Sequence, residues 1–301
     1  MSGSTDAVAD VTPPPRLLQR LARSRLHVPR AGTAGGVGEH LSSTLGPALE
    51  FAEYRAYQPG DDLRRVDPFL EARTGELHVR EGDVLEQLAV TVVVDMSASM
   101  AHGTPEKSLL ARRVAAALAY AGLAGTDRVR LAAFTGRGLA WSPRGASVRA
   151  APLLFGWLAG LKPGGAAEFA DVARALAARL PRPGLCVVVS DWLFESATAG
   201  LGVLRAARQE VVGVQVLAPE ELDPRALGTG AVTLEDAESG RAASVVLTPE
   251  VRAGYGRALD EWRAELKASF LRHGGTWLEA ESGADVTGLL MKEWAPVGLV
   301  R

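Results

Sequence analysis

The chain has 301 residues, a formal net charge of −2 at pH 7 and a single cysteine, Cys186. With 47% hydrophobic and 23% charged residues it can bury a substantial core, which excludes a wholly disordered chain. No stretch approaches the ~18 consecutive apolar residues of a membrane-spanning helix, and one cysteine excludes an intrachain disulfide. The near-neutral charge removes the general reason to expect a nucleic-acid partner. The first residues lack the basic and apolar segments of a secretory signal, so we expect a cytoplasmic protein.

Two regions precede the main domain. Residues 1–45 form an arm, expected to be partly flexible, with three prolines, leucines at helical spacing and a glycine-rich end. Its leucines are typical either of an arm that docks on its own domain or of a basic amphipathic helix for a membrane surface. Residues 46–87 are polar and acidic, and a turn signal at 59–62 between short alternating pieces predicts a small β-rich flap.

Residues 88–301 carry the main domain, in which buried strands alternate with helices. The nearly continuous apolar run at 88–95 is typical of a strand buried on both faces. The pattern then predicts helices over 105–124, 148–161, 168–180 and 197–210, and strands over 129–134, 185–190 and 211–217. We therefore expect an α/β fold, with a doubly wound, mostly parallel sheet covered by helices on both faces.

The alternation stops after residue 217. Segments 231–236 and 242–248 flank a glycine-bearing loop and predict a late β-hairpin. A long helix follows, a last strand is expected at 275–281 and a last helix at 285–294. The long helix has an apolar stripe of Val251, Tyr255, Leu259, Trp262, Leu266 and Phe270.

The residues that could carry chemistry stand where two predicted strands end. Asp95, Ser97 and Ser99 follow the first buried strand, and Asp191 follows the strand at 185–190. Because ligands bind at the carboxyl edge of such sheets, neighbouring strands would bring Asp95 and Asp191 together. Carboxylate and hydroxyl oxygens suit a hard cation such as Mg²⁺, although each residue could instead simply cap the helix that follows.

Four segments carry a family resemblance. They are VVVDMSASM at 92–100, VVVSDW at 187–192, the flap segment 50–64 and the hairpin segment 234–240. The first two resemble the von Willebrand factor A-type fold with its metal-ion-dependent adhesion site (MIDAS). With the other two, the chain resembles the bacterial family labelled "domain of unknown function 58" over roughly residues 36–295.

This resemblance implies a protein-interaction module rather than an enzyme. Asp95, Ser97, Ser99 and Asp191 would hold Mg²⁺ or Mn²⁺, and a carboxylate of a protein partner would complete the coordination. Implied partners are a MoxR-type AAA+ ATPase and a client complex that it matures or remodels. The family's second metal loop has a threonine where this chain has Ala166, so the site is degenerate, and Glu168 is a possible substitute ligand.

Two alternatives remain open. In one, the fold is a metal-independent scaffold that recognises partners through the flap and the rim of the site. The rim residues would be Tyr54, Arg55, Tyr57, Asp61, Asp62 and Trp192, with Trp192 either an exposed anchor or packed under the flap. In the other, the chain is a Mg²⁺-dependent phosphatase with Asp95 as nucleophile. Such enzymes need a second acidic residue two positions on, where this chain has Ser97.

Overall fold

The computed structural model of the chain describes residues 2–28, 53–61, 66, 68–81, 87–181, 183–223, 225, 228 and 230–301. Contacts divide the chain into two units, and each is described by itself. The larger unit comprises residues 1–33 and 88–301, and the smaller comprises residues 34–87. The smaller unit and the predicted flap both end at residue 87.

A six-stranded sheet forms the centre of the larger unit, in the order β10-β7-β6-β3-β4-β5. Its strands are β3 (Ala89–Asp95), β4 (Arg128–Thr135), β5 (Gly138–Gly145), β6 (Gly184–Ser190), β7 (Gln209–Leu217) and β10 (Thr276–Glu281). All neighbouring pairs are parallel except β4 and β5, which are antiparallel. The predicted doubly wound, mostly parallel α/β class is thereby confirmed.

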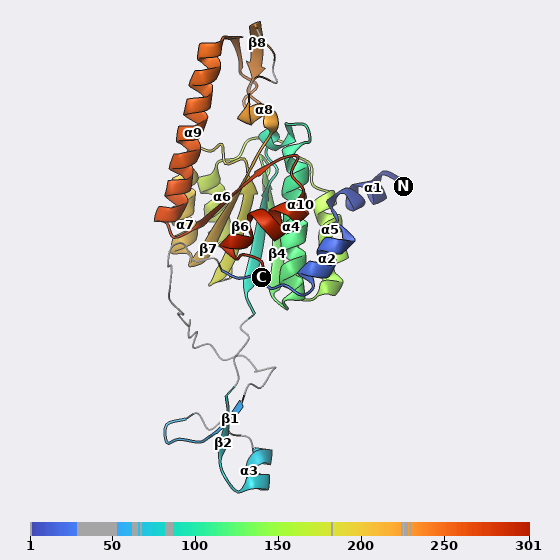
Figure 1. Cartoon of the computed structure of the whole chain (residues 1–301), viewed down its shortest axis with the longest axis vertical. Helices are drawn as coiled ribbons and strands as arrows, with labels where there is room; N and C mark the ends of the chain where they lie inside the picture. Colours follow the sequence, from blue (N-terminus) through green and yellow to red (C-terminus); the bar gives the residue numbers. More distant parts are fainter. Residues whose placement is uncertain are drawn as a thin grey trace. The chain divides into compact units, whose positions relative to one another are not determined.

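Helices cover both faces of this sheet (Figure 1). The helices are α4 (Lys107–Ala124), α5 (Ala151–Ala159), α6 (Phe169–Ala177), α7 (Ala197–Ala206), α9 (Pro249–Arg272) and α10 (Val286–Gly288). Side chains alternate between the faces of a strand, and β3 follows this rule. Val92 and Val94 join a core with α4 and α5, whereas Val93 joins a second core with α6, α7 and the end of α9.

The N-terminal arm packs on its own unit. Helices α1 (Ser2–Val11) and α2 (Pro15–Leu21) bury Val11, Leu17 and Leu21 completely. Leu26 then forms an isolated antiparallel bridge with Val300 near the other end of the chain. Of the two interpretations of the arm, docking on its own domain therefore holds as far as residue 28; residues 29–45 lie outside the described residues.

Two sequence expectations for the larger unit need correction. No strand was expected at 138–145, yet β5 forms there as an antiparallel edge strand along β4. The apolar stripe of α9 is buried only near its end, at Leu266 and Phe270, whereas Val251 and Tyr255 are each 41% exposed. The first half of this helix extends beyond the sheet (Figure 1), so no core lies beneath those residues.

The smaller unit contains a two-stranded antiparallel sheet of β1 (Glu53–Ala56) and β2 (His78–Glu81). These are the short strands expected in the flap. A helix, α3 (Pro68–Thr74), lies between them in the sequence and was not expected. Of the helices that the structure describes in either unit, none is long and apolar enough to cross a membrane.

Candidate functional site

The first loop of the candidate site follows β3 and is organised by Asp95. This residue is completely buried, as expected for the end of a central strand. Its Oδ1 accepts a hydrogen bond from the backbone N of Ser97 at 2.8 Å, and its Oδ2 accepts one from Ser190 Oγ at 2.6 Å. The two bonds hold the loop against the end of β6.

Two hydroxyl groups lie together on this loop. Ser97 precedes a short 3₁₀ helix at Ala98–Ala101, which contains Ser99, and the two Oγ atoms are 3.0 Å apart. Ser97 is completely buried, and Ser99 is partly exposed. The Asp-x-Ser-x-Ser spacing therefore gathers three oxygen-bearing side chains at one point of the sheet edge.

Asp191 approaches the same point from the end of β6. Strands β3 and β6 are paired in parallel, with Val94 opposite Val189, so the residues that follow each strand emerge at the same edge. Burial, reinforced by the negative charge of Asp191, raises the pKa of Asp95 to about 7. The two strands are therefore neighbours, as expected, and Asp191 acts electrostatically on Asp95. The role of these residues as a metal site stays a prediction.

A buried lysine that sequence analysis did not identify completes this charge cluster. Lys107, the first residue of α4, is completely buried, and its Nζ lies 2.8 Å from Asp191 Oδ2 and 2.5 Å from Glu221 Oε1. Burial alone would lower the pKa of Lys107, but the charges of these two carboxylates raise it above its usual value. Lys107 is therefore a fixed cation bound to one oxygen of Asp191.

The second loop, residues 163–168, lies directly against the first. Gly164 N donates to Met96 O, and Ala98 N donates to Gly165 O, both at 2.8 Å. Gly165 has a φ of +75°, and a Cβ there would lie only 2.7 Å from Gly136 Cα. A glycine is therefore required at this position, where the second loop passes the turn between β4 and β5. Ala166, which follows, brings no oxygen-bearing side chain to the site.

Glu168, the possible substitute ligand, is exposed and bound to a neighbouring loop. Its Oε2 accepts a hydrogen bond from Ser196 Oγ at 2.7 Å, and Ser196 Oγ accepts one from Ala170 N at 3.1 Å. The carboxylate thus joins the start of α6 to the residues before α7. Its role as a metal ligand stays a prediction.

Another acidic residue comes from a distant part of the chain. Glu238 is exposed and lies in the loop between β8 (Gly230–Glu235) and β9 (Ala242–Leu247). Burial and the negative charges of Asp191 and Asp236 raise the pKa of Glu238. Sequence analysis identified the hairpin but not this electrostatic interaction.

The donor set is compatible with a hard divalent cation. It consists of the hydroxyls of Ser97 and Ser99 and the carboxylates of Asp95 and Asp191, all oxygen donors of the kind that Mg²⁺ and Mn²⁺ prefer. Among the residues that the structure describes, no group of three or more His, Cys, Asp or Glu side chains is arranged to hold a metal ion. A cation here would therefore depend on the serine hydroxyls.

Trp192 does not belong to an exposed rim. The side chain is completely buried, so the prediction that it is an exposed anchor is wrong. It packs edge-on against Phe169 and Phe270, with ring centroids 4.8 and 4.9 Å away, and its Nε1 donates to Val214 O at 3.2 Å. Its aromatic neighbours account for this burial, since Trp192 fills the space between α6 and the end of α9.

The rim residues predicted in the flap belong to the smaller unit. Tyr54 and Arg55 lie in β1, but their side chains and the whole of Asp62 are outside the described residues. Tyr57 N donates to Leu77 O at 2.8 Å, and Asp61 Oδ2 accepts from Gln58 N at 2.8 Å within a turn. Their role in partner binding stays a prediction.

Solved structures with partial likeness to the chain come from several kinds of protein. An aerotolerance-related membrane protein from Bacteroides fragilis aligns with 68% of this chain and 98% of its own, at 16% identity and a TM-score of 0.42. The pilus adhesin SpaC from Lactobacillus rhamnosus GG aligns with 71% of this chain and 30% of its own, at 11% identity and a TM-score of 0.44. The TRAP protein of Plasmodium vivax, in a manganese-loaded crystal, aligns with 44% of this chain and 57% of its own, at 14% identity and a TM-score of 0.34.

Sequence relatives are more similar and cover more of the chain. Uncharacterized proteins of Mycobacterium bovis and Mycobacterium tuberculosis are each 33% identical over 255 residues, which is 82% of this chain and 79% of theirs. The sequence pattern of a family described as "Protein of unknown function DUF58" matches residues 53–265. This confirms the resemblance found in the sequence: the chain belongs to the DUF58 family.

Proposed function

We propose that this chain is a protein-interaction module that receives a carboxylate of a protein partner at the edge where β3 and β6 end. The observation that supports this most is the pair of hydroxyls of Ser97 and Ser99, 3.0 Å apart, beside the carboxylates of Asp95 and Asp191. These four residues would hold Mg²⁺ or Mn²⁺ as in a metal-ion-dependent adhesion site. When bound, the cation supplies a positively charged position that attracts a carboxylate.

The chain's own residues orient this site. Asp95 fixes the backbone of the first loop through Ser97 N and joins it to β6 through Ser190. Because Asp95 and Ser97 are completely buried, Ser99, which is partly exposed, is the one of these three side chains nearest to solvent. The site is therefore a rigid receptor on strand ends, which suits recognition of a partner.

Calorimetric titration with Mg²⁺ and Mn²⁺ tests the metal part of this proposal. Saturable binding to the wild-type chain, lost in Ser97→Ala and in Ser99→Ala, supports it. Ser24→Ala is the matched control, because Ser24 lies in the arm and its hydroxyl donates to Arg20 O there. Absence of saturable binding, or binding that Ser97→Ala leaves unchanged, removes the metal from the proposal.

The partner class comes from the family resemblance. In this proposal, the module binds a MoxR-type AAA+ ATPase and the client complex on which that ATPase acts. The test is to immobilise the full chain and measure capture of the purified ATPase with Mg²⁺ and with EDTA. Capture that needs Mg²⁺ and Ser97 supports the metal-dependent module, whereas no capture in either condition removes the ATPase as partner.

A metal-independent scaffold is the second candidate, and the position of Lys107 favours it. Its ammonium group already neutralises Asp191 inside the site, as a bound cation would. The scaffold predicts that capture of the ATPase survives EDTA but fails when residues 54–62 are altered. Loss of capture in EDTA would contradict it.

A phosphatase is not favoured by the surroundings of Asp95. A nucleophilic carboxylate needs access to its substrate, whereas Asp95 is completely buried and both of its oxygens accept hydrogen bonds. We expect no turnover of an aryl phosphate in the presence of Mg²⁺. Hydrolysis that disappears in Asp95→Asn would overturn this expectation.

A further inference from the structure

Two arginines lie directly opposite each other on β4 and β5. Arg130 of β4 pairs in register with Arg144 of β5. Directly opposite residues of an antiparallel pair project from the same face with Cβ atoms about 4.5–5.5 Å apart, and like charges in this position are destabilising. The pairing therefore places two guanidinium groups side by side at an energetic cost that the sheet itself does not explain.

Arg130 is held in place by an aromatic ring. Its Cζ lies 4.3 Å from the centroid of the Trp141 ring, and its Nε donates to Ser142 O at 3.4 Å. A register shift between Arg130 and Ala132 allows β5 to place both Trp141 and Arg144 beside Arg130. The guanidinium of Arg130 is therefore positioned by a cation–π contact rather than by a carboxylate.

A third arginine adds positive charge on the same face of the sheet. Arg179 lies two residues beyond α6, and α6 packs against β5 and the second core. Burial, and then the positive charges of Arg144 and Arg179, lower the pKa of Arg130. The charged form of Arg130 is therefore less stable here than in water, and an anion beside it would relieve this.

Arg130, Arg144 and Arg179 are together called the arginine face. Within the described part of the chain, none of the three forms an ion pair with a carboxylate. Other arginines of the same unit do pair with Asp or Glu, namely Arg174, Arg205, Arg225 and Arg263. Arg144 and Arg179 are exposed and Arg130 is partly exposed, so a ligand can reach all three.

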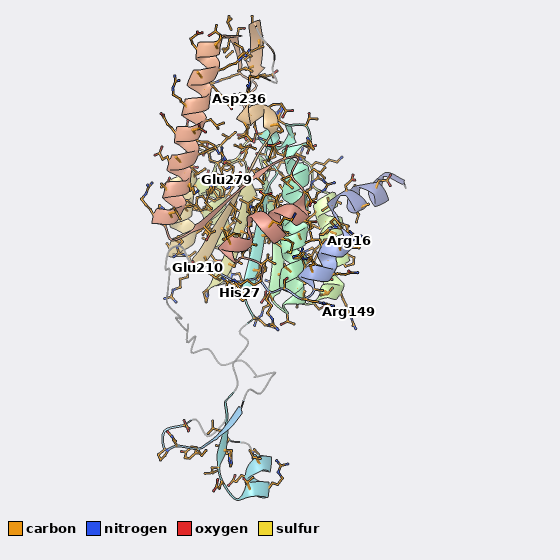
Figure 2. All side chains as sticks on the ribbon, viewed as in Figure 1. Arg16, His27, Arg149, Glu210, Asp236 and Glu279 are labelled. Carbon is orange, nitrogen blue, oxygen red and sulfur yellow. The ribbon has the colours of Figure 1, made fainter. Side chains whose placement is uncertain are left out.

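The arginine face lies toward the end of the sheet opposite to the candidate metal site. Arg130 is paired with Thr91, which precedes Asp95 by four residues, or about 13 Å along β3. In Figure 2, Glu210, at the start of β7, and Arg149, in the turn that follows β5, both lie toward this end of the sheet. The arginine face is therefore separate from the acidic groups that follow β3 and β6.

The chemistry of a ligand follows from these positions. Guanidinium groups bind carboxylates through paired N–H donors. In an extended peptide, side chains two residues apart share a face and are separated by about 6.6 Å. Two neighbouring guanidinium groups can therefore bind alternate acidic side chains of one extended segment. The net charge of −2 leaves the chain as a whole without the positive field that attracts nucleic acids.

We propose that the arginine face binds an acidic segment of a protein partner, with Arg130 and Arg144 binding alternate carboxylates and Arg179 adding positive charge. This is a second contact surface, in addition to the proposed site where β3 and β6 end. It needs no metal ion, because the arginines themselves supply the positive charge.

Fluorescence anisotropy with the full chain and a labelled peptide tests the ligand class. The probe is a short peptide in which glutamate alternates with threonine, and its control has glutamine at every glutamate position. We expect the glutamate peptide to bind at least about tenfold more tightly than its control, by a margin that shrinks as salt is added. Equal binding of the two peptides overturns the proposal.

Substitutions separate the arginine face from general electrostatic attraction. We expect the affinity for the glutamate peptide to fall about threefold or more in Arg144→Gln, and about tenfold or more when Arg130→Gln is added. Arg257→Gln is the matched control, because it removes the same charge from an exposed position on α9. Equal affinity of Arg144→Gln and wild type, or an equal loss in Arg257→Gln, overturns the proposal.

A stability measurement distinguishes a binding role of Arg144 from a structural one. Because Arg144→Gln removes one of two opposed like charges, its midpoint of thermal unfolding should equal or exceed that of wild type. A midpoint clearly below those of wild type and Arg257→Gln would show that Arg144 supports the fold, and overturns the proposal.

Two further conditions separate the arginine face from the proposed metal site and from other anions. Peptide binding should be the same with Mg²⁺, with EDTA and in Ser97→Ala, even if the metal titration is flat. Binding that is lost with EDTA or in Ser97→Ala would belong to the metal site and overturns this inference. Displacement of the peptide by an equimolar amount of inorganic phosphate would indicate a phosphate site and overturns the assignment to carboxylates.

Discussion

Lys107 Nζ donates a hydrogen bond to Asp191 Oδ2 at 2.8 Å, and the two side chains are only 0% and 1% exposed. The residues are separated by 84 positions in the sequence. Their pairing places the start of α4 under the loop that follows β6, at the centre of the candidate site. A buried charge is costly unless it is paired. The stability of the domain therefore depends on the charge pair of Lys107 and Asp191 inside the site.

Replacing Lys107 is therefore expected to destabilise the chain strongly. Lys107→Met leaves Asp191 buried without its cation and removes the partner of Glu221, at a cost of about 3–5 kcal/mol in the free energy of unfolding. Urea denaturation measures the change, with Lys162→Met, at an exposed position, as control. A Lys107→Met variant within about 0.5 kcal/mol of wild type would show that the pair contributes no net stability.

The close approach of Gly165, in the second loop, to Gly136 gives a prediction with a neighbouring control. Gly165→Ala puts a side chain at a φ of +75° and places its Cβ 2.7 Å from Gly136 Cα, so we expect the free energy of unfolding to fall by about 1–3 kcal/mol. Because this loop adjoins the proposed metal site, the proposal also predicts weaker cation binding in this variant. A Cβ at Gly164 would meet no atom within 4 Å, so Gly164→Ala should stay near wild type. Equal effects of the two substitutions in thermal unfolding and metal titration would contradict this reading of the loop.

Trp192 is expected to act on stability and not on partner binding. Trp192→Ala removes the ring that joins Phe169 to Phe270, and the cavity should cost about 3–5 kcal/mol. The next residue, Leu193, is 53% exposed, so Leu193→Ala should change the unfolding free energy by less than about 0.5 kcal/mol. Chemical denaturation of the two variants checks this, and a small effect at Trp192 would contradict the packing described.

Some of the site could be predicted because its signal is local. The runs that form β3 and β6 are apolar throughout, as strands covered on both faces require, and each ends at an acidic residue or beside one. Parallel pairing then makes the meeting of Asp95 and Asp191 a consequence of topology. The order of the buried strands and helices was predictable for the same reason.

The remainder of the site depends on contacts that leave no local pattern. The pairing of Lys107 with Glu221 spans 114 positions, and nothing in either segment indicates its partner. The charge of Asp191 acts on Glu238 only because the hairpin runs back toward the sheet, a direction that hairpin sequences do not encode. The edge strand β5 was missed because its glycines, serine and Pro143 are typical of a loop, and an edge position tolerates them.

Asp127 gives the domain a pH dependence that can be isolated from the site. Burial raises its pKa from 3.8 to about 6, although Leu88 N donates to its Oδ1 at 3.1 Å. The folded state binds the proton of Asp127 more tightly than the unfolded state does. The stability that this proton contributes is therefore full below pH 4 and is lost as the pH rises through 6.

Asparagine at position 127 retains an acceptor for Leu88 N and takes up no proton. We therefore expect the unfolding free energy of Asp127→Asn, relative to wild type, to rise by up to about 3 kcal/mol between pH 4 and pH 7 in urea titrations. A difference that stays constant over this range would show that Asp127 has the same pKa in both states.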